Sequence, residues 1–290
     1  MKHIRRAGLL AALLLIATPP GLSLLIFRSH TYTPPPAGAQ ARSPIPFASA
    51  PFAVTTDDGV VIRGFTAGGG GDTVILALHG FGRDLTQMAD RWRGLYPGAA
   101  SFAVMDFRNH GISGPAPTTF GYDEARDVAA VAAHLKKNHA RVVAWGLSMG
   151  AAAAARAARQ GAPVDALALE GMYDTLSNAI ASRGGKMGIP RWPLIPMTLW
   201  WYERLSGVRL DDMDMARILR GLDMPVLLVH SLGDEKVPRE AFETLRAALG
   251  PAGETFLLAG GVHDAIYETN RGAYIEAMRG FLARAAARRG

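Results

Sequence analysis

Five short apolar runs, each bounded by turn residues, constrain the fold of this chain more than any other feature. They read TVILAL, SFAVM, RVVAWG, ALALE and PVLLV, and they begin at residues 73, 101, 141, 166 and 225. Continuous apolar runs of this length are typical of strands that are buried on both faces of a parallel sheet. A further run, ETFLLAG, begins at residue 254, and Asp58-Gly59 between two β-rich runs indicates a hairpin.

Helical patterns separate these strand runs. Residues 121–139 carry an apolar stripe with acidic residues early and lysines late, which suits the helix dipole. Residues 238–250 begin with proline and end with glycine, as helices often do, and residues 271–288 are the last helical stretch. This alternation predicts an α/β fold with a mostly parallel, doubly wound sheet that is covered by helices on both faces.

The segment from residue 171 to 220 breaks the alternation, because it contains no buried strand run. It holds three of the five tryptophans, Trp192, Trp200 and Trp201, and its prolines argue against one long helix. We predict a helical cap insertion whose tryptophans line an apolar substrate pocket. A helical excursion that faces the core is the alternative.

The first fifty residues differ in composition from the rest of the chain. Residues 1–28 join a basic start to an apolar stretch, which predicts a signal anchor that spans a membrane or a signal peptide that is cleaved. Residues 29–50 are rich in proline and predict an extended linker to the α/β domain of residues 51–290. The positive-inside rule places that domain outside the cytoplasm, periplasmic or extracellular, and either membrane-anchored or secreted.

Charge and composition argue against several other classes of protein. The net charge is +6, but five basic residues ahead of the first acidic residue account for all but one unit of it: Lys2, Arg5, Arg6, Arg28 and Arg42. The domain is therefore nearly neutral, and we expect no nucleic-acid partner. The chain has no cysteine and no histidine–carboxylate cluster, so we expect neither a metal site nor a cofactor. The oligomeric state is open.

The sequence Gly146-Leu147-Ser148-Met149-Gly150 lies between an apolar run and a block of alanines. A G-x-S-x-G sequence at a strand-to-helix turn holds its serine in a tight bend, so that the hydroxyl stands clear of the backbone. The glycines and alanines allow the strand and the helix to approach closely. We predict Ser148 as a nucleophile; a purely structural serine in a turn is the alternative.

A serine nucleophile needs an adjacent base, and only two histidines follow Ser148. His230 lies within a strand run and is expected to pack in the core, whereas His263 lies in the glycine-rich loop AGGVHDAIYE. We therefore predict His263 as the base. Asp234, directly after a strand in HSLGDEKVP, is the predicted acid that orients the imidazole. Two neighbouring carboxylates compete for this role, Glu235 and Asp264.

The sequence HGFGRD, from His79 to Asp84, follows another strand run. A turn in this place can aim a backbone N–H group at the negative oxygen that develops in acyl transfer. We predict that the N–H groups of Phe81 and Met149 form this oxyanion hole, the second of them at a helix N-terminus.

With these motifs together, the chain resembles the α/β-hydrolase superfamily. It is most similar to the branch of serine aminopeptidases and monoacylglycerol-lipase-like enzymes, which has small membrane-anchored relatives. The matching pieces, between Asp72 and Asp264, are HGFG, MDFRNHGISG, GLSMGA, PVLLVHSLGDEKVP and GGVHD. The resemblance implies the α/β-hydrolase fold and the three catalytic residues named above, and it places residues 106–114 in a structural loop near the site. The strand before the acid usually ends His-Gly in this family, and here it ends His230-Ser231.

We therefore expect a serine hydrolase that acts by acyl transfer on a small-molecule ester or acyl substrate, as a carboxylesterase or a lysophospholipase-like enzyme. An aminopeptidase of the same fold is one alternative. It would need a carboxylate to hold the substrate amine, and the candidates are Glu170, Glu203 and Asp174. A non-catalytic scaffold that kept the fold is the alternative from another class.

Overall fold

The computed structural model describes residues 21–25, 28, 31, 49–68, 71–95 and 100–287. The predicted anchor or signal peptide (residues 1–28) and the predicted linker (residues 29–50) lie almost entirely outside these residues. Within the part of the chain that the structure describes, no helix combines the length and the apolar character needed to cross a membrane.

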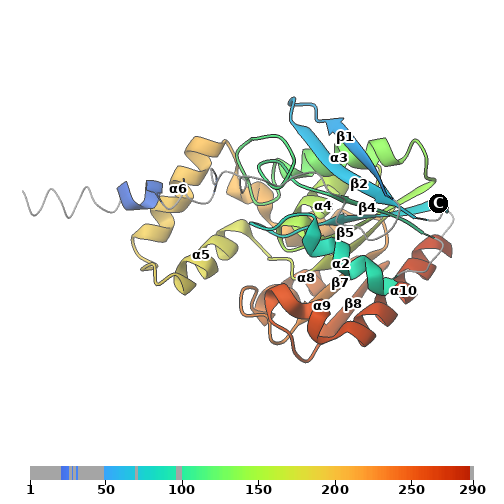
Figure 1. Cartoon of the computed structure of the whole chain (residues 1–290). Helices are drawn as coiled ribbons and strands as arrows, with labels where there is room; N and C mark the ends of the chain where they lie inside the picture. Colours follow the sequence, from blue (N-terminus) through green and yellow to red (C-terminus); the bar gives the residue numbers. More distant parts are fainter. Residues whose placement is uncertain are drawn as a thin grey trace, which may run out of the picture.

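One sheet of eight strands runs through the described domain, in the order β1-β2-β4-β3-β5-β6-β7-β8 (Figure 1). The β1–β2 and β2–β4 pairs are antiparallel, and every other neighbouring pair is parallel. The predicted fold class is therefore confirmed. The strands are β1 Ser49–Thr55, β2 Val61–Ala67, β3 Thr73–Leu78, β4 Ser101–Met105, β5 Arg141–Leu147, β6 Ala166–Glu170, β7 Val226–Ser231 and β8 Gly253–Leu258.

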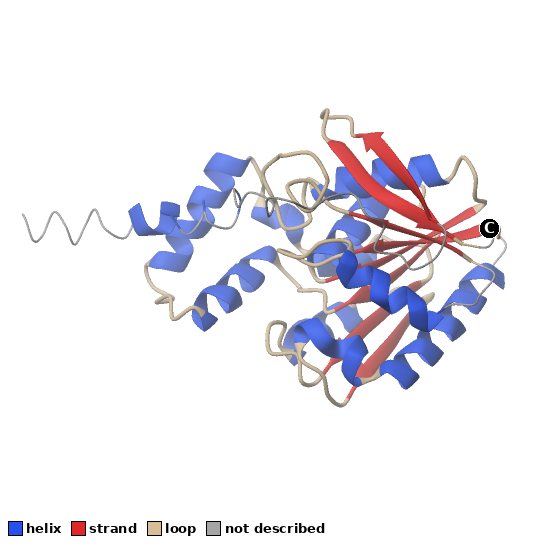
Figure 2. Cartoon of the chain, in the orientation of Figure 1, coloured by secondary structure: helices blue, strands red, loops and turns tan. Residues whose placement is uncertain are grey.

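Helices cover both faces of this sheet (Figure 2). The core cluster of one face includes residues of α3 Glu124–Leu135, α4 Met149–Arg159, α7 Met215–Arg220 and α8 Arg239–Ala247. The core cluster of the other face includes residues of α2 Thr86–Leu95, α9 Ile266–Thr269 and α10 Arg271–Ala287. The central strands are buried on both sides, which explains why their sequences are continuous apolar runs rather than alternating ones.

Two helices between β6 and β7 project beyond one end of the sheet (Figure 1). They are α5 Leu176–Lys186 and α6 Leu194–Ser206, which pack against each other, and together they are called the cap here. A short 3-10 helix, Leu210–Met213, follows them. The next helix, α7, packs against α4 and α8 and therefore belongs to the helical layer of the sheet rather than to the cap.

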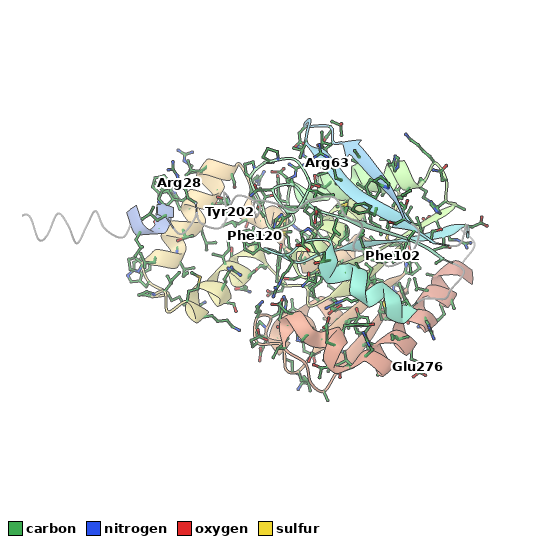
Figure 3. All side chains as sticks on the ribbon, in the orientation of Figure 1. Arg28, Arg63, Phe102, Phe120, Tyr202 and Glu276 are labelled. Carbon is green, nitrogen blue, oxygen red and sulfur yellow. The ribbon has the colours of Figure 1, made fainter. Side chains whose placement is uncertain are left out.

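The cap meets the main domain through aromatic side chains. The ring of Tyr202 from α6, which is almost fully buried, lies 6.1 Å from that of Phe120 in the loop between β4 and α3 (Figure 3). Leu24, in the described turn of helix at residues 21–25, also packs against the core cluster that contains Tyr202.

The order of the strands places the functional end of the sheet. The chain leaves β3 for β4 on one side and later returns to pair β5 on the other side of β3. The carboxyl ends of β3 and β5 therefore lie next to each other where the strand order reverses, and ligands of open α/β sheets bind at such a point. The turn after β3 and Ser148 after β5 both lie there.

Candidate active site

Ser148 occupies a strained backbone position directly between β5 and α4. Its φ is 52° and its ψ is −110°, a conformation that a residue with a side chain rarely adopts. Its N–H donates a hydrogen bond of 2.8 Å to the carbonyl of Glu170 at the end of β6. The neighbouring strand therefore holds the bend in place, and the serine is only half-buried at the start of the helix.

The two glycines that flank Ser148 are required by close contacts of the backbone. A Cβ atom on Gly146 would lie 2.4 Å from the carbonyl of Gly150, and one on Gly150 would lie 2.5 Å from the carbonyl oxygen of Leu78 in β3. The alanines that follow, residues 151–155, are all fully buried. Small side chains thus let α4 begin directly against the strands, as the motif predicts.

His263 lies within hydrogen-bonding distance of Asp234. Its Nδ1 is 2.7 Å from Oδ2 of Asp234, and the two side chains are almost fully buried. The other carboxylate oxygen, Oδ1, accepts the N–H groups of Lys236 and Val237 at 2.8 and 2.9 Å. Burial raises the pKa of Asp234, but the hydrogen bonds and charge of its neighbours outweigh this and hold the pKa below its ordinary value. The carboxylate stays ionised and can orient the imidazole.

The two carboxylates that competed with Asp234 have other partners. Oε2 of Glu235 accepts the backbone N–H of His263 at 2.9 Å and therefore steadies the loop rather than the ring. Asp264 accepts hydrogen bonds from Lys236 at 2.7 Å and from Arg83 at 2.9 Å. Among these three acids, only Asp234 contacts the imidazole in the described structure. His230, as expected, is buried, and it stacks on Phe242.

Hydrogen bonds to side chains fix the backbone of the turn after β3. The N–H of Gly80 donates to Oε1 of Gln87 at 2.9 Å, and the N–H of Gly82 donates to Nε2 of His110 at 3.2 Å. His79, fully buried, accepts the N–H of Phe107 at its Nε2 and contacts the Gly80 carbonyl through Nδ1. Burial and the neighbouring His110 lower the pKa of His79 to about 3, so its ring is neutral at ordinary pH.

The loop between β4 and α3 supplies a further wall of the site. Phe120 in this loop has a φ of 54°, and its ring stacks on that of Phe81 at 4.6 Å. The buried carboxylate of Glu124 accepts the N–H groups of Thr119 and Gly121, at 2.8 and 2.7 Å, and so fixes the backbone on both sides of Phe120. Sequence reasoning did not identify Phe120 or Glu124.

A cavity of about 310 Å³ brings the predicted catalytic residues together. Its wall includes Ser148, His263 and both residues of the predicted oxyanion hole, Phe81 and Met149. No hydrogen bond joins the Ser148 hydroxyl to His263 within the described chain, a common situation in enzymes without bound substrate. The other lining residues are Phe120, Tyr173, Ala179, Ser182, Arg183, Lys186, Met187, Lys236 and Val237.

The three tryptophans predicted to line the pocket are not part of this wall. Trp192 is 79% exposed and Trp200 is 53% exposed, and Trp201 contacts the ring of Trp200. The cause is the face on which α6 packs: position 200 falls on the opposite side of the helix, whereas Trp201 at the edge of the buried face is half-buried and packs against the core cluster instead of the cavity. The buried residues of α6 are Leu194, Ile195, Thr198 and Tyr202. The cap reaches the cavity through α5 instead.

A buried ionic network supports the end of β6 behind Ser148. Nη1 of Arg91 lies 2.5 Å from Oε2 of Glu170, and both side chains are fully buried. The same oxygen accepts the hydroxyl of Tyr274 at 2.5 Å, and that hydroxyl accepts Nε1–H of Trp145 at 3.0 Å. Burial and the Glu170 carboxylate raise the pKa of Tyr274 well above its ordinary value, so the phenol remains a donor.

The next residue, Gly171, lies directly against His263 and Asp234. Its φ is +54°, and a Cβ atom there would lie 3.1 Å from Cε1 of His263 and 3.4 Å from Oδ2 of Asp234. The end of β6 therefore contacts both Ser148 and His263. The carbonyl of Glu170 accepts the N–H of Ser148, and the missing side chain of Gly171 leaves room for the imidazole of His263.

The fold agrees with comparison to known proteins. The profile of the alpha/beta hydrolase family matches residues 74–289, and the chain therefore belongs to that family. Its fold is similar to that of the esterase Pf2001 from Pyrococcus furiosus, with a TM-score of 0.71 and 22% identity, over 87% of this chain and 97% of that one. It is also similar to the esterase EaEST from Exiguobacterium antarcticum, with a TM-score of 0.62 and 17% identity, over 80% and 99%.

The sequence is also similar to that of a curated protein. The uncharacterized protein YqkD from Bacillus subtilis (strain 168) is 26% identical over 185 residues, which cover 62% of this chain and 61% of that protein. The match thus spans less than two thirds of the relative.

Proposed function

We propose that this protein is a serine ester hydrolase that works by acyl transfer, as a carboxylesterase or a lysophospholipase-like enzyme. The observation that carries the proposal is that the strained Ser148 and His263, whose ring is paired with Asp234, line the same cavity. A base oriented by a carboxylate, next to an exposed serine hydroxyl, is the arrangement that activates a nucleophile. The esterase structures with the same fold support this class of reaction.

In the proposed mechanism, the Ser148 hydroxyl oxygen attacks the ester carbonyl while Nε2 of His263 takes its proton. Asp234 keeps the proton on Nδ1 and stabilises the imidazolium. The N–H groups of Phe81 and Met149 stabilise the oxyanion of the tetrahedral intermediate. The C–O bond then breaks, and the leaving alcohol receives the proton from His263. Water repeats the sequence on the acyl-enzyme and releases the acid and free Ser148.

The wall of the cavity favours esters over peptides with a free amino terminus. An aminopeptidase needs a carboxylate near the scissile bond, and no carboxylate of the described residues lines this cavity. Of the three candidates, Glu170 is fully buried against Arg91, and Glu203 is an exposed residue of α6. Asp174 lines a neighbouring cavity of about 600 Å³ and accepts the amide of Asn178. The aromatic and aliphatic lining of the first cavity suits an acyl group.

The same proposal includes a location. We propose that the apolar segment of residues 1–28 anchors the protein in a membrane with the catalytic domain outside the cytoplasm; secretion after cleavage is the alternative. The basic start and apolar stretch of that segment support it. Immunoblots of membrane and soluble fractions with a C-terminal tag test it, and a tagged protein found only in the cytosol would contradict both forms.

Labelling with a fluorophosphonate tests the reaction class directly. We expect the wild-type protein to be labelled and Ser148→Ala to be unlabelled, and we expect p-nitrophenyl esters to be cleaved in preference to aminoacyl-anilides. A preference for anilides would support the aminopeptidase instead. If the folded wild-type protein were not labelled and cleaved no ester, the non-catalytic scaffold would be the remaining hypothesis.

A further inference from the structure

The cavity that reaches Ser148 has an uneven distribution of charge. Among the residues that the structure describes, three cationic side chains line it, Arg183 and Lys186 from α5 and Lys236 from the segment after β7, and no aspartate or glutamate does. The rest of the lining is mainly aromatic and aliphatic. Cations at the mouth of an apolar cavity concentrate negatively charged ligands, because low-dielectric walls focus the field.

Two of these three cations already have carboxylate partners. Nζ of Lys236 lies 2.7 Å from Asp264, which also binds Arg83. Nζ of Lys186 lies 3.8 Å from Glu235, a weaker pair on the exposed side of α5. These carboxylates stand outside the wall of the cavity, and they offset the charge of the two lysines.

Arg183 differs from both lysines. Its guanidinium forms no ion pair and no hydrogen bond with any residue of the described chain, and it lies over the ring of Phe81 with Cζ 4.8 Å from the ring centre. Phe81 is a residue of the predicted oxyanion hole. Stacking on it therefore holds a positive charge with unused N–H donors beside the place where the ester reacts.

We propose that Arg183 makes this enzyme selective for esters that carry a negatively charged group, a carboxylate or a phosphate, on their acyl or alcohol part. This inference rests on the proposed esterase function and specifies its substrate class. The planar guanidinium matches both groups with two parallel hydrogen bonds. Because the ring of Phe81 restrains the side chain, less rotamer freedom is lost when the substrate binds.

Matched pairs of esters test the proposal and distinguish the two anions. On the acyl side, the 4-methylumbelliferyl monoester of glutarate is compared with the pentanoate, which has the same chain length and no charge. On the alcohol side, a 1-acylglycerol 3-phosphate is compared with the 1-acylglycerol. For at least one pair we expect kcat/KM to be about tenfold higher for the anionic member, with a ratio that falls as salt concentration rises.

Three variants assign that ratio to Arg183. We expect Arg183→Gln to reduce the ratio to about one, Arg183→Lys to retain part of it, and Arg204→Gln to leave it unchanged, since Arg204 is an exposed arginine of α6 outside the cavity. Fluorophosphonate labelling of each variant checks that its site is intact. Equal cleavage of both members of both pairs by the wild type, or a preference that survives in Arg183→Gln, would overturn the inference while the esterase function stands. Failure of that function has a different signature, because no ester is then cleaved.

Discussion

The two sides of the cavity are built in opposite ways. The side formed by the sheet is largely buried and held by many contacts: the N–H of Ser148 donates to the Glu170 carbonyl, His263 pairs with Asp234, and the Arg91–Glu170 ion pair lies behind β6. The side formed by the cap is exposed and loosely connected. Arg183 stacks on a ring, Lys186 has one distant partner, and Trp192 and Trp200 face outward.

We propose that this difference separates the catalytic chemistry of the site from its substrate selectivity. Geometry within about 0.5 Å is needed for proton transfer and oxyanion stabilisation, and only a rigid, buried scaffold provides it. Substrate recognition by a cap tolerates more movement and more variation in sequence. We therefore expect substitutions on the sheet side to lower kcat or stability strongly, and substitutions on the cap side to change substrate preference or nothing.

The largest effect is expected at Asp234. Asp234→Asn keeps the shape of the side chain but removes the charge that orients and stabilises His263, and kcat should fall about 10⁴-fold with KM little changed. Steady-state kinetics with a p-nitrophenyl ester measure it. Glu235→Gln is the matched control, because Glu235 accepts the backbone N–H of His263 and does not contact its ring in the described structure. Equal losses in the two variants would refute the assignment of the acid.

The ion pair behind β6 gives the next largest effect, on stability. Glu170→Gln removes the buried partner of the fully buried Arg91 and leaves it only the half-exposed carboxylate of Glu268 at 3.6 Å, which should lower the free energy of unfolding by about 3 kcal/mol. Breaking the partly exposed Lys186–Glu235 pair on the cap with Lys186→Gln should cost under about 0.5 kcal/mol. Urea denaturation compares them.

A paired variant sharpens that test. Arg91→Met with Glu170→Leu removes both buried charges and should recover much of the stability lost in Glu170→Gln. If Glu170→Gln unfolds at the same urea concentration as the wild type, the buried pair does not support the sheet end as described.

The sequence predicts the sheet side well, for a physical reason. In a parallel sheet, residues that directly follow strands meet at one edge, so Ser148 after β5 and Asp234 after β7 had to converge. The position of His263 followed from the loop after β8. The support behind them could not be predicted, because Arg91 and Glu170 are 79 residues apart and no local pattern joins them.

The cap side was predicted less well. Its helical character follows from the lack of strand runs, but the face that a helix buries depends on its packing partners. In α6 that face carries Tyr202, so Trp200 is exposed and Trp201 packs against the core cluster rather than lining the cavity. The helix α5 has few apolar residues, and nothing in its sequence marks Arg183 as the residue over Phe81.

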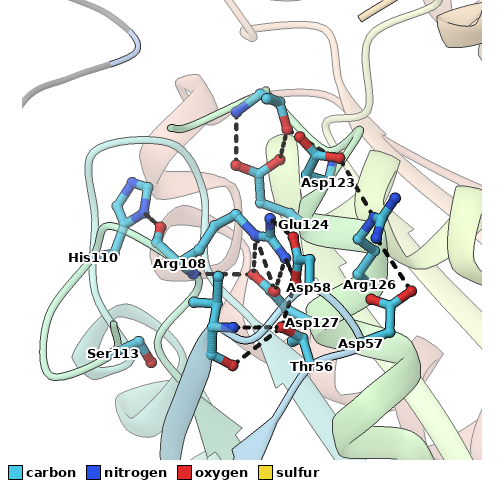
Figure 4. Close-up of polar contacts among 12 residues, drawn as sticks. Thr56, Asp57, Asp58, Arg108, His110, Ser113, Asp123, Glu124, Arg126 and Asp127 are labelled. Atoms are coloured by element: carbon cyan, nitrogen blue, oxygen red, sulfur yellow. Dashed lines mark hydrogen bonds and ion pairs between the residues drawn. The ribbon is translucent and has the colours of Figure 1, made fainter. Parts of the chain in front are cut away.

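A variant of His110 tests how rigid the sheet side is away from the predicted catalytic residues. Nε2 of His110 accepts the N–H of Gly82, and its own loop is fixed by Arg108, whose guanidinium binds Asp127 at 2.7 Å and Asp58 at 2.8 Å (Figure 4). We predict that His110→Leu frees the turn after β3, which carries the predicted oxyanion-hole residue Phe81, and that it lowers kcat about 10- to 100-fold without raising KM.

A conservative variant separates positioning from packing at this site. His110→Gln keeps an acceptor of similar reach and should restore most of kcat, whereas a residue needed only for packing would not distinguish Leu from Gln in this way. An increase in KM with unchanged kcat would place His110 in substrate binding instead.

Asp264 binds Lys236, which lines the cavity, and Arg83 in the turn after β3. We predict that it gives the stability of the protein a small dependence on pH. Burial raises its pKa, but Lys236 and Arg83 outweigh this and lower it to about 2. Because the pKa is lower in the folded than in the unfolded chain, the stabilisation is complete above about pH 4 and is lost as the pH falls toward 2. The side chain is one-third exposed, so Asp264→Asn should remove about 1 kcal/mol or less of the difference in unfolding free energy between pH 5 and pH 2. Urea denaturation at a series of pH values measures this. If Asp264→Asn lost as much stability between pH 5 and pH 2 as the wild type, the pairing of Asp264 with Lys236 and Arg83 would be contradicted.

The smallest effect is expected at Trp192, and it bears directly on the comparison. This side chain is largely exposed on the cap and does not line the cavity, so Trp192→Ser should change kcat/KM for short, soluble p-nitrophenyl esters by less than about twofold. Phe120→Ser is the matched control, because that ring lines the cavity and stacks on Phe81, and it should raise KM for the same esters several-fold. A loss at Trp192 as large as that at Phe120 would mean that the cap closes over the substrate with its outer face. Substrate selectivity and catalysis would then both depend on closure of the cap, rather than on separate sides of the cavity.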